Sequence, residues 1–282
     1  MSLEETLEYF SILGGLEEEV ELDYFSDVFS MVKSHFVKDF SKFQSLISPS
    51  FLLESPYQNI LIALARGDGK LYSSLRKAKI AESLGEGLIQ ELIDLNILKV
   101  ERSREAPLRT HPKHKLKKEQ RNYRIQDKIR FVQPFLRFWF AFVSYYAKDL
   151  AQGEGDAFLA NFEQHYERLR SLVYEQLCDA ILIEYYKEKS PILSSGSYWN
   201  IYSEFDILAV TREKQLILGE CKYKDRSVCK NELTKLKQKA AESGIKVDVY
   251  ALFSKSGFSK ELLQRKDNNL LLFDLSDLKQ LL

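Results

Sequence analysis

The sequence predicts a mixed α+β protein, and two patterns carry this prediction. Apolar residues recur at helical spacing between residues 25 and 47, which indicates that the chain begins with helices. From residue 161, a long helical pattern precedes three strand-like runs, a second helix and a fourth strand-like run. A helix that joins two strands of one sheet indicates a crossover, so we expect a mixed sheet with the order α-β-β-β-α-β.

Residues 1–52 form the first predicted part, which is helical. A short amphipathic helix is expected over 3–13, where a pair of glycines ends it. A second helix is expected over 25–47. It ends before Pro49, because the residue that precedes a proline is sterically disfavoured in the helical conformation.

Residues 53–128 contain three predicted helices. The first has an apolar face over 60–65 and ends at a Gly-Asp-Gly turn. The second is expected over 73–84 with Ser73 as its cap, since a serine hydroxyl can accept from the free N–H groups of a first turn. The third is expected over 85–95.

Two strands, at 97–102 and 122–125, are expected to follow, which gives the element order of a winged helix. Winged helices commonly place the third helix in the major groove of DNA. Here that helix carries Glu86, Glu91 and Asp94 and no base, so it would repel phosphate. The loop between the strands is the better candidate surface, although a winged helix used only for protein packing stays open.

This loop is strongly basic. Residues 99–124 carry ten basic side chains against three acidic ones, in a chain with no net charge. A local positive field of this kind is typical of a phosphate-binding surface, and the alternative is a solvated loop. The candidate nucleic-acid contacts in the loop are Arg102, Arg104, Lys113, Lys115, Lys117 and Lys118.

Residues 129–160 form an aromatic-rich connecting segment. Phe135, Phe138, Trp139 and Phe142 fall at i, i+3, i+4 and i+7. An aromatic stripe at this spacing is typical of a helix buried in a core, so we favour that interpretation over a base-stacking platform. The last predicted part, 161–282, holds the α-β-β-β-α-β pattern.

Composition narrows the class of protein. The most apolar stretch, 138–147, is about half the ~20 residues that a membrane-spanning helix needs, so we expect no membrane partner. Residues 3–9 are acidic, unlike a secretory signal. Three cysteines at spacings that fit neither a metal site nor a redox motif favour a cytoplasmic location.

The chain has no nucleotide-binding loop. The segment 67–70 contains a Gly-Lys pair, but it lacks the earlier glycine and the Ser or Thr of a P-loop and does not follow a strand. We therefore expect no ATP binding and no ATPase activity from this chain.

The chemistry is expected around Asp206, Glu220 and Lys222. Strand alternation puts Glu220 and Lys222 on one face, and a neighbouring strand would bring Asp206 to them. Two carboxylates can hold Mg²⁺ or Mn²⁺ together with waters and a substrate phosphate, while a lysine neutralises developing negative charge. A structural ion pair between the lysine and a carboxylate is the alternative interpretation.

The spacing of Asp206 and the Glu220-Cys221-Lys222 segment, after a long helix, resembles the PD-(D/E)XK nuclease superfamily. That resemblance implies a restriction-endonuclease-like sheet, metal ligation by Asp206 and Glu220, and a catalytic role for Lys222. The superfamily often adds an acid from its first helix, and Glu175 matches that place, although it lies roughly opposite the main apolar stripe of the helix. Lys239 is implied as a phosphate contact.

A second resemblance covers most of residues 57–243. The segments 122–125 and 134–140, with Trp199, 204–207, 219–222 and 236–239, are similar to the C-terminal region of archaeal-type DEXX-box ATPases, a domain of unknown function found also in bacteria. This resemblance implies that residues 1–52 are the end of an ATPase lid and that an ATPase module is a partner.

Two functions follow as expectations. The first is a Mg²⁺- or Mn²⁺-dependent nucleic-acid phosphodiesterase, with DNA favoured, joined to a winged-helix nucleic-acid-binding domain. The second is a non-catalytic DNA- or partner-binding regulatory module of an ATPase, in which the nuclease-like fold is only a scaffold.

Overall fold

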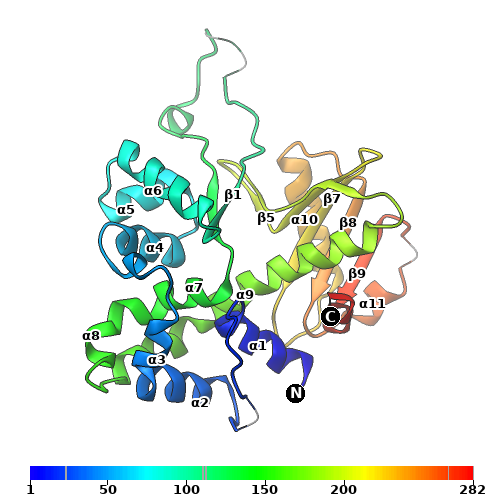
Figure 1. The fold of residues 1–282 in the computed structure, drawn as a ribbon. Helices are drawn as coiled ribbons and strands as arrows, with labels where there is room; N and C mark the ends of the chain where they lie inside the picture. The colour runs from blue at the N-terminus through cyan, green and yellow to red at the C-terminus, as the bar shows by residue number, and fades with distance from the viewer. Residues whose placement is uncertain (23, 110, 112, 266, 282) are drawn as a thin grey trace. The chain divides into compact units, whose positions relative to one another are not determined.

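The computed structural model describes residues 1–22, 24–109, 111, 113–265 and 267–281. Its contacts divide the chain into two compact units, each built from two stretches of sequence (Figure 1). Unit 1 comprises Met1–Arg102 and Gln126–Arg170, and unit 2 comprises Ser103–Ile125 and Ser171–Leu282. The chain therefore leaves unit 1, contributes 103–125 to unit 2, and returns. The domain boundaries expected at residues 52, 128 and 160 stay predictions.

Unit 1 begins with α1 (Leu3–Leu13), a helix with the bounds that the sequence predicts. A capping box starts it: the Glu5 N–H donates to the Ser2 hydroxyl at 3.2 Å, and the Ser2 N–H donates to the Glu5 carboxylate at 2.6 Å. Gly14 is its C-cap residue. Local hydrogen bonds thus mark where this helix begins and ends.

The prediction of a single helix over 25–47 was wrong in one respect, because the helix is interrupted in the structure. The Asp39 N–H bonds the Ser34 carbonyl five residues back at 3.1 Å, which makes a π-helical turn. Phe36, Phe40 and Phe43 are nevertheless buried, as the apolar spacing requires. The elements are α2 (Val28–Lys33), η1 (Ser34–Lys38), α3 (Phe40–Ser45) and η2 (Ser50–Leu53).

Three helices follow, with boundaries that differ from the prediction. Ser73 does not cap a helix; its N–H donates to the Gln126 side chain at 3.2 Å from within α5. Gly85 lies inside α6, where an added Cβ would meet the Leu75 side chain at 2.1 Å. The glycine therefore allows two helices to approach closely, and it does not mark a helix start. The helices are α4 (Tyr57–Arg66), α5 (Leu71–Ala78) and α6 (Glu82–Asp94).

The two-stranded sheet uses a different second strand from the one expected at 122–125. Strand β1 (Leu98–Glu101) pairs antiparallel with β2 (Lys128–Phe131). Two contacts select β2: the Ile129 N–H donates to the Gly69 carbonyl at 2.7 Å, and the Phe131 ring packs on Phe140. The expected partner was wrong because such contacts lie outside the local sequence.

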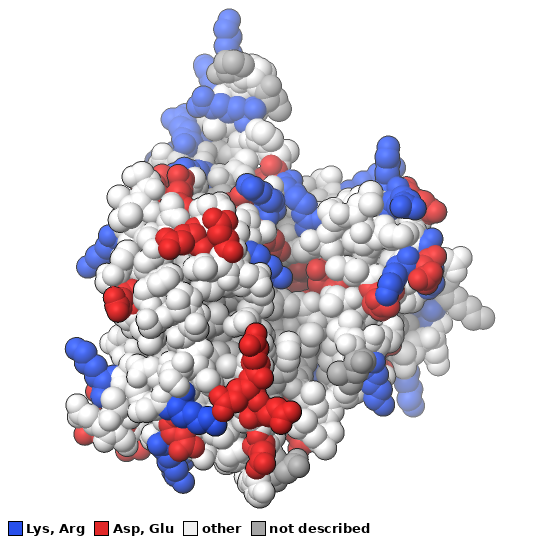
Figure 2. All heavy atoms as spheres, viewed as in Figure 1, with Lys and Arg blue, Asp and Glu red and all other residues white. Residues whose placement is uncertain are grey.

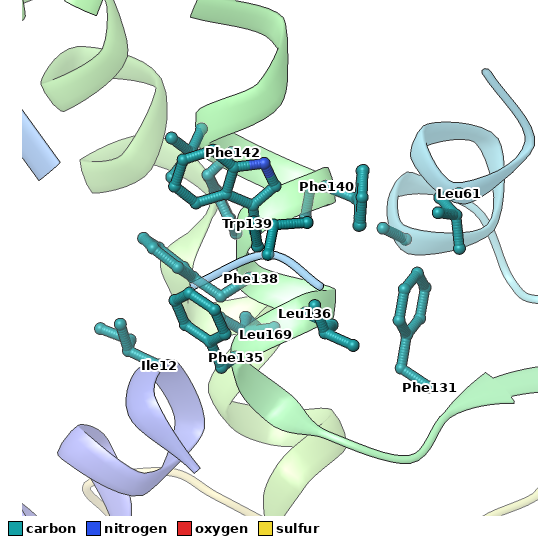
Figure 3. Close-up of a cluster of buried hydrophobic side chains, with 14 of the residues drawn as sticks. Ile12, Leu61, Phe131, Phe135, Leu136, Phe138, Trp139, Phe140, Phe142 and Leu169 are labelled. Carbon is teal, nitrogen blue, oxygen red and sulfur yellow. The ribbon is translucent and has the colours of Figure 1, made fainter. Parts of the chain in front are cut away.

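The aromatic stripe of residues 135–142 is buried, as predicted. Figure 3 shows Phe135, Phe138, Trp139 and Phe142 within a cluster of apolar side chains from several elements of unit 1. One continuous helix does not form, because a π-helical turn again interrupts it. The elements are α7 (Pro134–Phe138), η4 (Trp139–Val143), η5 (Ser144–Tyr146) and α8 (Ala147–Leu150).

Unit 2 contains a five-stranded mixed sheet in the order β3-β6-β7-β8-β9. Strands β3, β6 and β7 pair antiparallel, whereas β7, β8 and β9 pair parallel. This confirms the α+β class and the mixed sheet. Its elements are α9 (Asp156–Tyr186, which begins in unit 1), β3 (Ile192–Ser194), β6 (Ile207–Thr211), β7 (Leu216–Lys222), α10 (Lys230–Glu242), β8 (Val249–Ser254), α11 (Lys260–Leu263), β9 (Leu270–Asp274) and η6 (Leu275–Leu281).

Two details of the sheet correct the prediction. The run expected over 198–202 does not join the main sheet; β4 (Tyr198–Trp199) and β5 (Glu204–Phe205) form a small ladder of their own. The edge strand beside β6 is instead β3, which the alternation pattern does not single out. These pairings are made by backbone hydrogen bonds, and the alternation of side chains along a strand does not predict which strand it pairs with.

Helices α9 and α10 cover opposite faces of the sheet (Figure 1). Leu208, Leu218 and Leu252 pack with Leu233 and Leu236 of α10. On the other face, the Cys221 thiol of β7 lies beside Cys178 of α9, which, after burial, helps to raise the pKa of Cys221. Since side chains alternate along β7, Glu220 and Lys222 share the face of α10. Within the described residues, no helix is both long enough and apolar enough to span a bilayer.

Candidate functional site

Asp206 lies at the bend between β5 and β6, where the chain passes from the small ladder into the main sheet. The terminal pair of the β6–β7 ladder is Ile207 with Gly219, so the next position outward sets Asp206 opposite Glu220. An added Cβ on Gly219 would lie 2.9 Å from the Cβ of Ile207, which shows how closely the strands approach there. The structure thus brings two carboxylate residues to one end of the ladder.

The Asp206 carboxylate is largely buried and accepts a hydrogen bond from the Cys221 N–H at 2.7 Å. Burial, followed by the negative charge of Glu220, raises the pKa of Asp206 to about 6. The Cys221 N–H and the positive charges of Lys222 and Lys239 oppose this rise. Repulsion between the two carboxylates is therefore only partly relieved.

Lys222 forms an ion pair with Glu220, and both side chains are largely shielded from solvent, at 22% and 18% exposure. Burial alone would lower the pKa of Lys222, but the charge and hydrogen bond of Glu220 and the charge of Asp206 together raise it. The ammonium group therefore stays protonated at neutral pH. It can donate hydrogen bonds and neutralise an anion, but it is not a base.

Lys239 reaches this end of the sheet from α10. Its ammonium group donates to the Glu204 carbonyl and lies 4.6 Å from the centroid of the Phe205 ring. Its charge also lowers the pKa of Asp206. The structure thus gives Lys239 a position beside Asp206, while its expected contact with phosphate stays a prediction.

Glu175 approaches from α9, the helix on the opposite face of the sheet. After burial, the charges of Asp206 and Glu175 are among the causes that raise the pKa of the Cys221 thiol. Glu175 therefore lies in the electrostatic neighbourhood of Cys221, between the two other residues of the Glu220-Cys221-Lys222 segment. Its role as a further acid of the site stays a prediction.

The basic loop divides into residues with different surroundings. Arg102, 81% exposed, pairs with Asp127 at 3.1 Å in unit 1. Arg104 donates to the carbonyl oxygens of Leu208, Gly196 and Ser197 in unit 2. This guanidinium joins the loop to the main sheet and is not simply displayed to solvent. The four exposed lysines of the loop, where Figure 2 shows basic side chains at the tip, are Lys113, Lys115, Lys117 and Lys118.

The residues present fit a magnesium-type ion. Among the residues that the structure describes, no cluster of three or more His, Cys, Asp or Glu side chains has the geometry of a metal site. Mg²⁺, however, is commonly held by one or two carboxylates and keeps several waters. The fit rests on Asp206, whose carboxylate is buried beside the negatively charged Glu220. A divalent cation bound between them would relieve the repulsion between the two carboxylates.

Three basic residues beside this site were not predicted from the sequence. Lys224, Arg226 and Lys235 line a cavity together with Lys222. A signal was present in the sequence, because bases recur at 222, 224 and 226 directly after the carboxylate of β7. Lys235 could be added only once the position of α10 was known.

The fold and the cluster define an α+β protein with a carboxylate–carboxylate–lysine group at one end of a mixed sheet. Over residues 139–241 the chain is similar to DUF234, a family described as archaeal and bacterial proteins of unknown function. The matched segment contains Asp206, Glu220 and Lys222, and it confirms the expected resemblance to a domain of unknown function found in archaea and bacteria. No curated protein and no solved structure matches the chain.

Proposed function

We propose that unit 2 is a divalent-metal-dependent phosphodiesterase domain that acts on nucleic acid, with DNA as the favoured substrate. The observation that carries this proposal is the convergence of Asp206, Glu220 and Lys222 at one end of the β6–β7 ladder. Two shielded carboxylates with a protonated lysine beside them match the needs of phosphodiester hydrolysis, which develops negative charge on the phosphoryl oxygens.

Each residue has a defined task in this proposal. Asp206 and Glu220 hold the ion, and the hydrogen bond from the Cys221 N–H fixes the Asp206 carboxylate. When bound, Mg²⁺ or Mn²⁺ supplies positive charge to the phosphoryl oxygens. Lys222 donates from its ammonium group either to the attacking water or to a phosphoryl oxygen. Lys239 adds positive charge near Asp206.

The remaining parts of the proposal concern partners. Helices α4, α5 and α6 followed by the β1–β2 pair support a winged helix in unit 1, and the lysine-rich loop supports contact with DNA backbone. The resemblance to DEXX-box ATPases supports an ATPase module as a partner. ATP itself is not proposed as a ligand, and a calorimetric titration with Mg²⁺-ATP should give no one-site isotherm.

A second candidate is a non-catalytic nucleic-acid-binding module. It is favoured by the Glu220–Lys222 ion pair, because these two groups already neutralise each other. In this alternative the cluster only stabilises the end of the sheet, and binding of nucleic acid needs no divalent ion.

Cleavage assays separate the two candidates. The protein is incubated with single-stranded, duplex and branched DNA in Mn²⁺, in Mg²⁺ and in chelator. We expect metal-dependent cleavage that Asp206→Asn abolishes. The matched control is Glu213→Gln in the turn that joins β6 to β7, an exposed acid at the other end of the same hairpin, which should retain full activity. Salt-dependent binding without cleavage in any metal would contradict the phosphodiesterase and favour the second candidate.

A further inference from the structure

A cavity of about 270 Å³ adjoins Lys222, between the segment that follows β7 and the beginning of α10. Four of its lining side chains are cationic and one is acidic. The cations are Lys222, Lys224, Arg226 and Lys235, and the acid is Glu232.

The single acid does not balance the cations. Glu232 pairs with Lys235 at 3.0 Å, and this hydrogen bond is the main cause that lowers the pKa of Glu232. The charges of Lys222 and Arg226, which line the same cavity, lower it further. Glu220 likewise neutralises Lys222, so Lys224 and Arg226 supply the excess positive charge around the cavity. An anion bound within it would be stabilised mainly by these two side chains.

The walls of the cavity are held in place. The Val228 N–H donates to the Gly257 carbonyl at 2.9 Å, and the Ser259 N–H donates to the Val228 carbonyl at 2.9 Å. The Ser256 hydroxyl also donates to the Lys224 carbonyl at 2.8 Å. The segment after β7 is thus bound to the segment after β8, and the cations do not depend on a free loop for their positions.

The cavity and the candidate phosphodiesterase site share Lys222, which pairs with Glu220 and also lines the cavity. We propose that the cavity binds a phosphate group of the nucleic-acid strand, next to the phosphate that is hydrolysed. Its volume lies just below the usual range of small-molecule pockets, so it holds a phosphate with its sugar but not a duplex. This inference rests on the proposed function for the identity of its ligand.

Binding is tested without metal, so that cleavage plays no part. A fluorescent single-stranded DNA oligonucleotide is titrated with the protein in chelator at several salt concentrations, and inorganic phosphate is used as a competitor against chloride of equal ionic strength. The test variant is Lys224→Gln with Arg226→Gln. The control is Lys214→Gln with Lys246→Gln, which removes the same charge from exposed positions at the other end of the sheet.

We expect the test variant to weaken binding about tenfold and the control to change it less than twofold. The salt dependence, log Kobs against log salt, should become shallower by about 0.7 for each DNA phosphate that the variant no longer neutralises. Phosphate should displace the oligonucleotide from wild type better than chloride does, and this difference should disappear in the test variant. Equal losses in both variants, or no preference for phosphate in wild type, would overturn the inference.

The two proposals fail in different ways. If the test variant loses binding but no DNA is cleaved in Mn²⁺ or Mg²⁺, the cavity stands as a phosphate site and the phosphodiesterase is wrong. If cleavage depends on Asp206 and the test variant binds like wild type, only the cavity inference is wrong. Thermal unfolding of each variant verifies that it is folded.

Discussion

The guanidinium group of Arg104 donates a hydrogen bond to the main-chain carbonyl of Leu208 at 2.7 Å. Leu208 lies two residues after Asp206, in the first strand of the candidate site. The same guanidinium also donates to the carbonyl oxygens of Gly196 and Ser197, at 2.8 and 3.0 Å. The base of the lysine-rich loop is therefore attached to the strand that carries one of the two carboxylates.

Arg104→Ala should destabilise unit 2. The substitution removes this donor from three carbonyl oxygens, of which the Gly196 carbonyl keeps the Leu208 N–H as a donor at 2.8 Å. An unsatisfied buried group costs about 1–3 kcal/mol, so we expect a loss of that order in the free energy of unfolding. Urea denaturation measures it. Arg109→Ala, at an exposed position of the same loop, should change stability by less than about 0.5 kcal/mol. Equal stability of the two variants would show that the Arg104 contacts contribute nothing.

Asp206 should make the metal-free protein less stable as pH rises. Because its pKa is raised from 3.8 to about 6, the folded state binds this proton more tightly than the unfolded state does. The protonated Asp206 carboxyl therefore contributes fully to the free energy of unfolding below pH 4. This contribution, on the order of 3 kcal/mol, is lost as pH rises through about 6.

Asp206→Asn isolates this contribution, since the amide resembles the protonated acid and can still accept from the Cys221 N–H. In chelator, wild type and variant should have similar unfolding free energies at pH 4, and the variant should be more stable at pH 8. Urea denaturation from pH 4 to pH 8 gives the difference. A variant that is less stable than wild type at pH 8 would mean that Lys222 and Lys239 outweigh burial.

Substitution of Glu220 should weaken Mn²⁺ binding, whereas substitution of Lys222 should lower stability in a way that Mn²⁺ restores. Glu220→Gln keeps the shape but removes one of two repelling charges, so Mn²⁺ affinity should fall at least tenfold while the protein in chelator keeps its stability. Lys222→Ala leaves the carboxylates opposed by less positive charge, so stability in chelator should fall by about 1–3 kcal/mol and saturating Mn²⁺ should restore it. Thermal unfolding with and without Mn²⁺ measures both.

A structural ion pair gives the opposite pattern. Both variants would then lose stability, because each removes one partner of a shielded pair, and Mn²⁺ would restore neither. Glu213→Gln serves as the reference for removal of an exposed acid from the same hairpin.

The exposed lysines of the loop should contribute to DNA affinity and not to folding. Charge reversal of Lys115, Lys117 and Lys118 to Glu should weaken duplex binding at low salt at least tenfold and reduce the salt slope by about 0.9 for each DNA phosphate that is no longer neutralised. The unfolding free energy should stay within about 0.5 kcal/mol of wild type. The control is the same charge reversal at three exposed lysines elsewhere in unit 2. If the loop variant keeps its affinity for DNA, or if the control loses as much affinity, the loop is merely solvated. The control residues are Lys214, Lys246 and Lys279.

The sequence by itself determined those features that depend on neighbours a few residues away. Helix α1 begins and ends where Ser2, Glu5 and Gly14 indicate, since its capping bonds span three or four residues. The aromatic stripe is buried because its spacing of three and four residues is the period of a helix. The grouping of Glu220 with Lys222 follows likewise from the period of two along β7.

Only the tertiary structure decided which distant segments meet. Strand β2, the partner of β1, makes contacts outside its own ladder: Ile129 bonds Gly69, and Phe131 packs on Phe140. No pattern within 122–131 predicts these contacts. Arg104 was expected at a phosphate, but it bonds carbonyl groups about a hundred residues away, which charge counting does not distinguish from exposure to solvent. The cavity beside Lys222 exists because the start of α10 packs back beside the end of β7. Local periodicity specifies which face of an element is buried, whereas long-range hydrogen bonds and packing decide what that face meets.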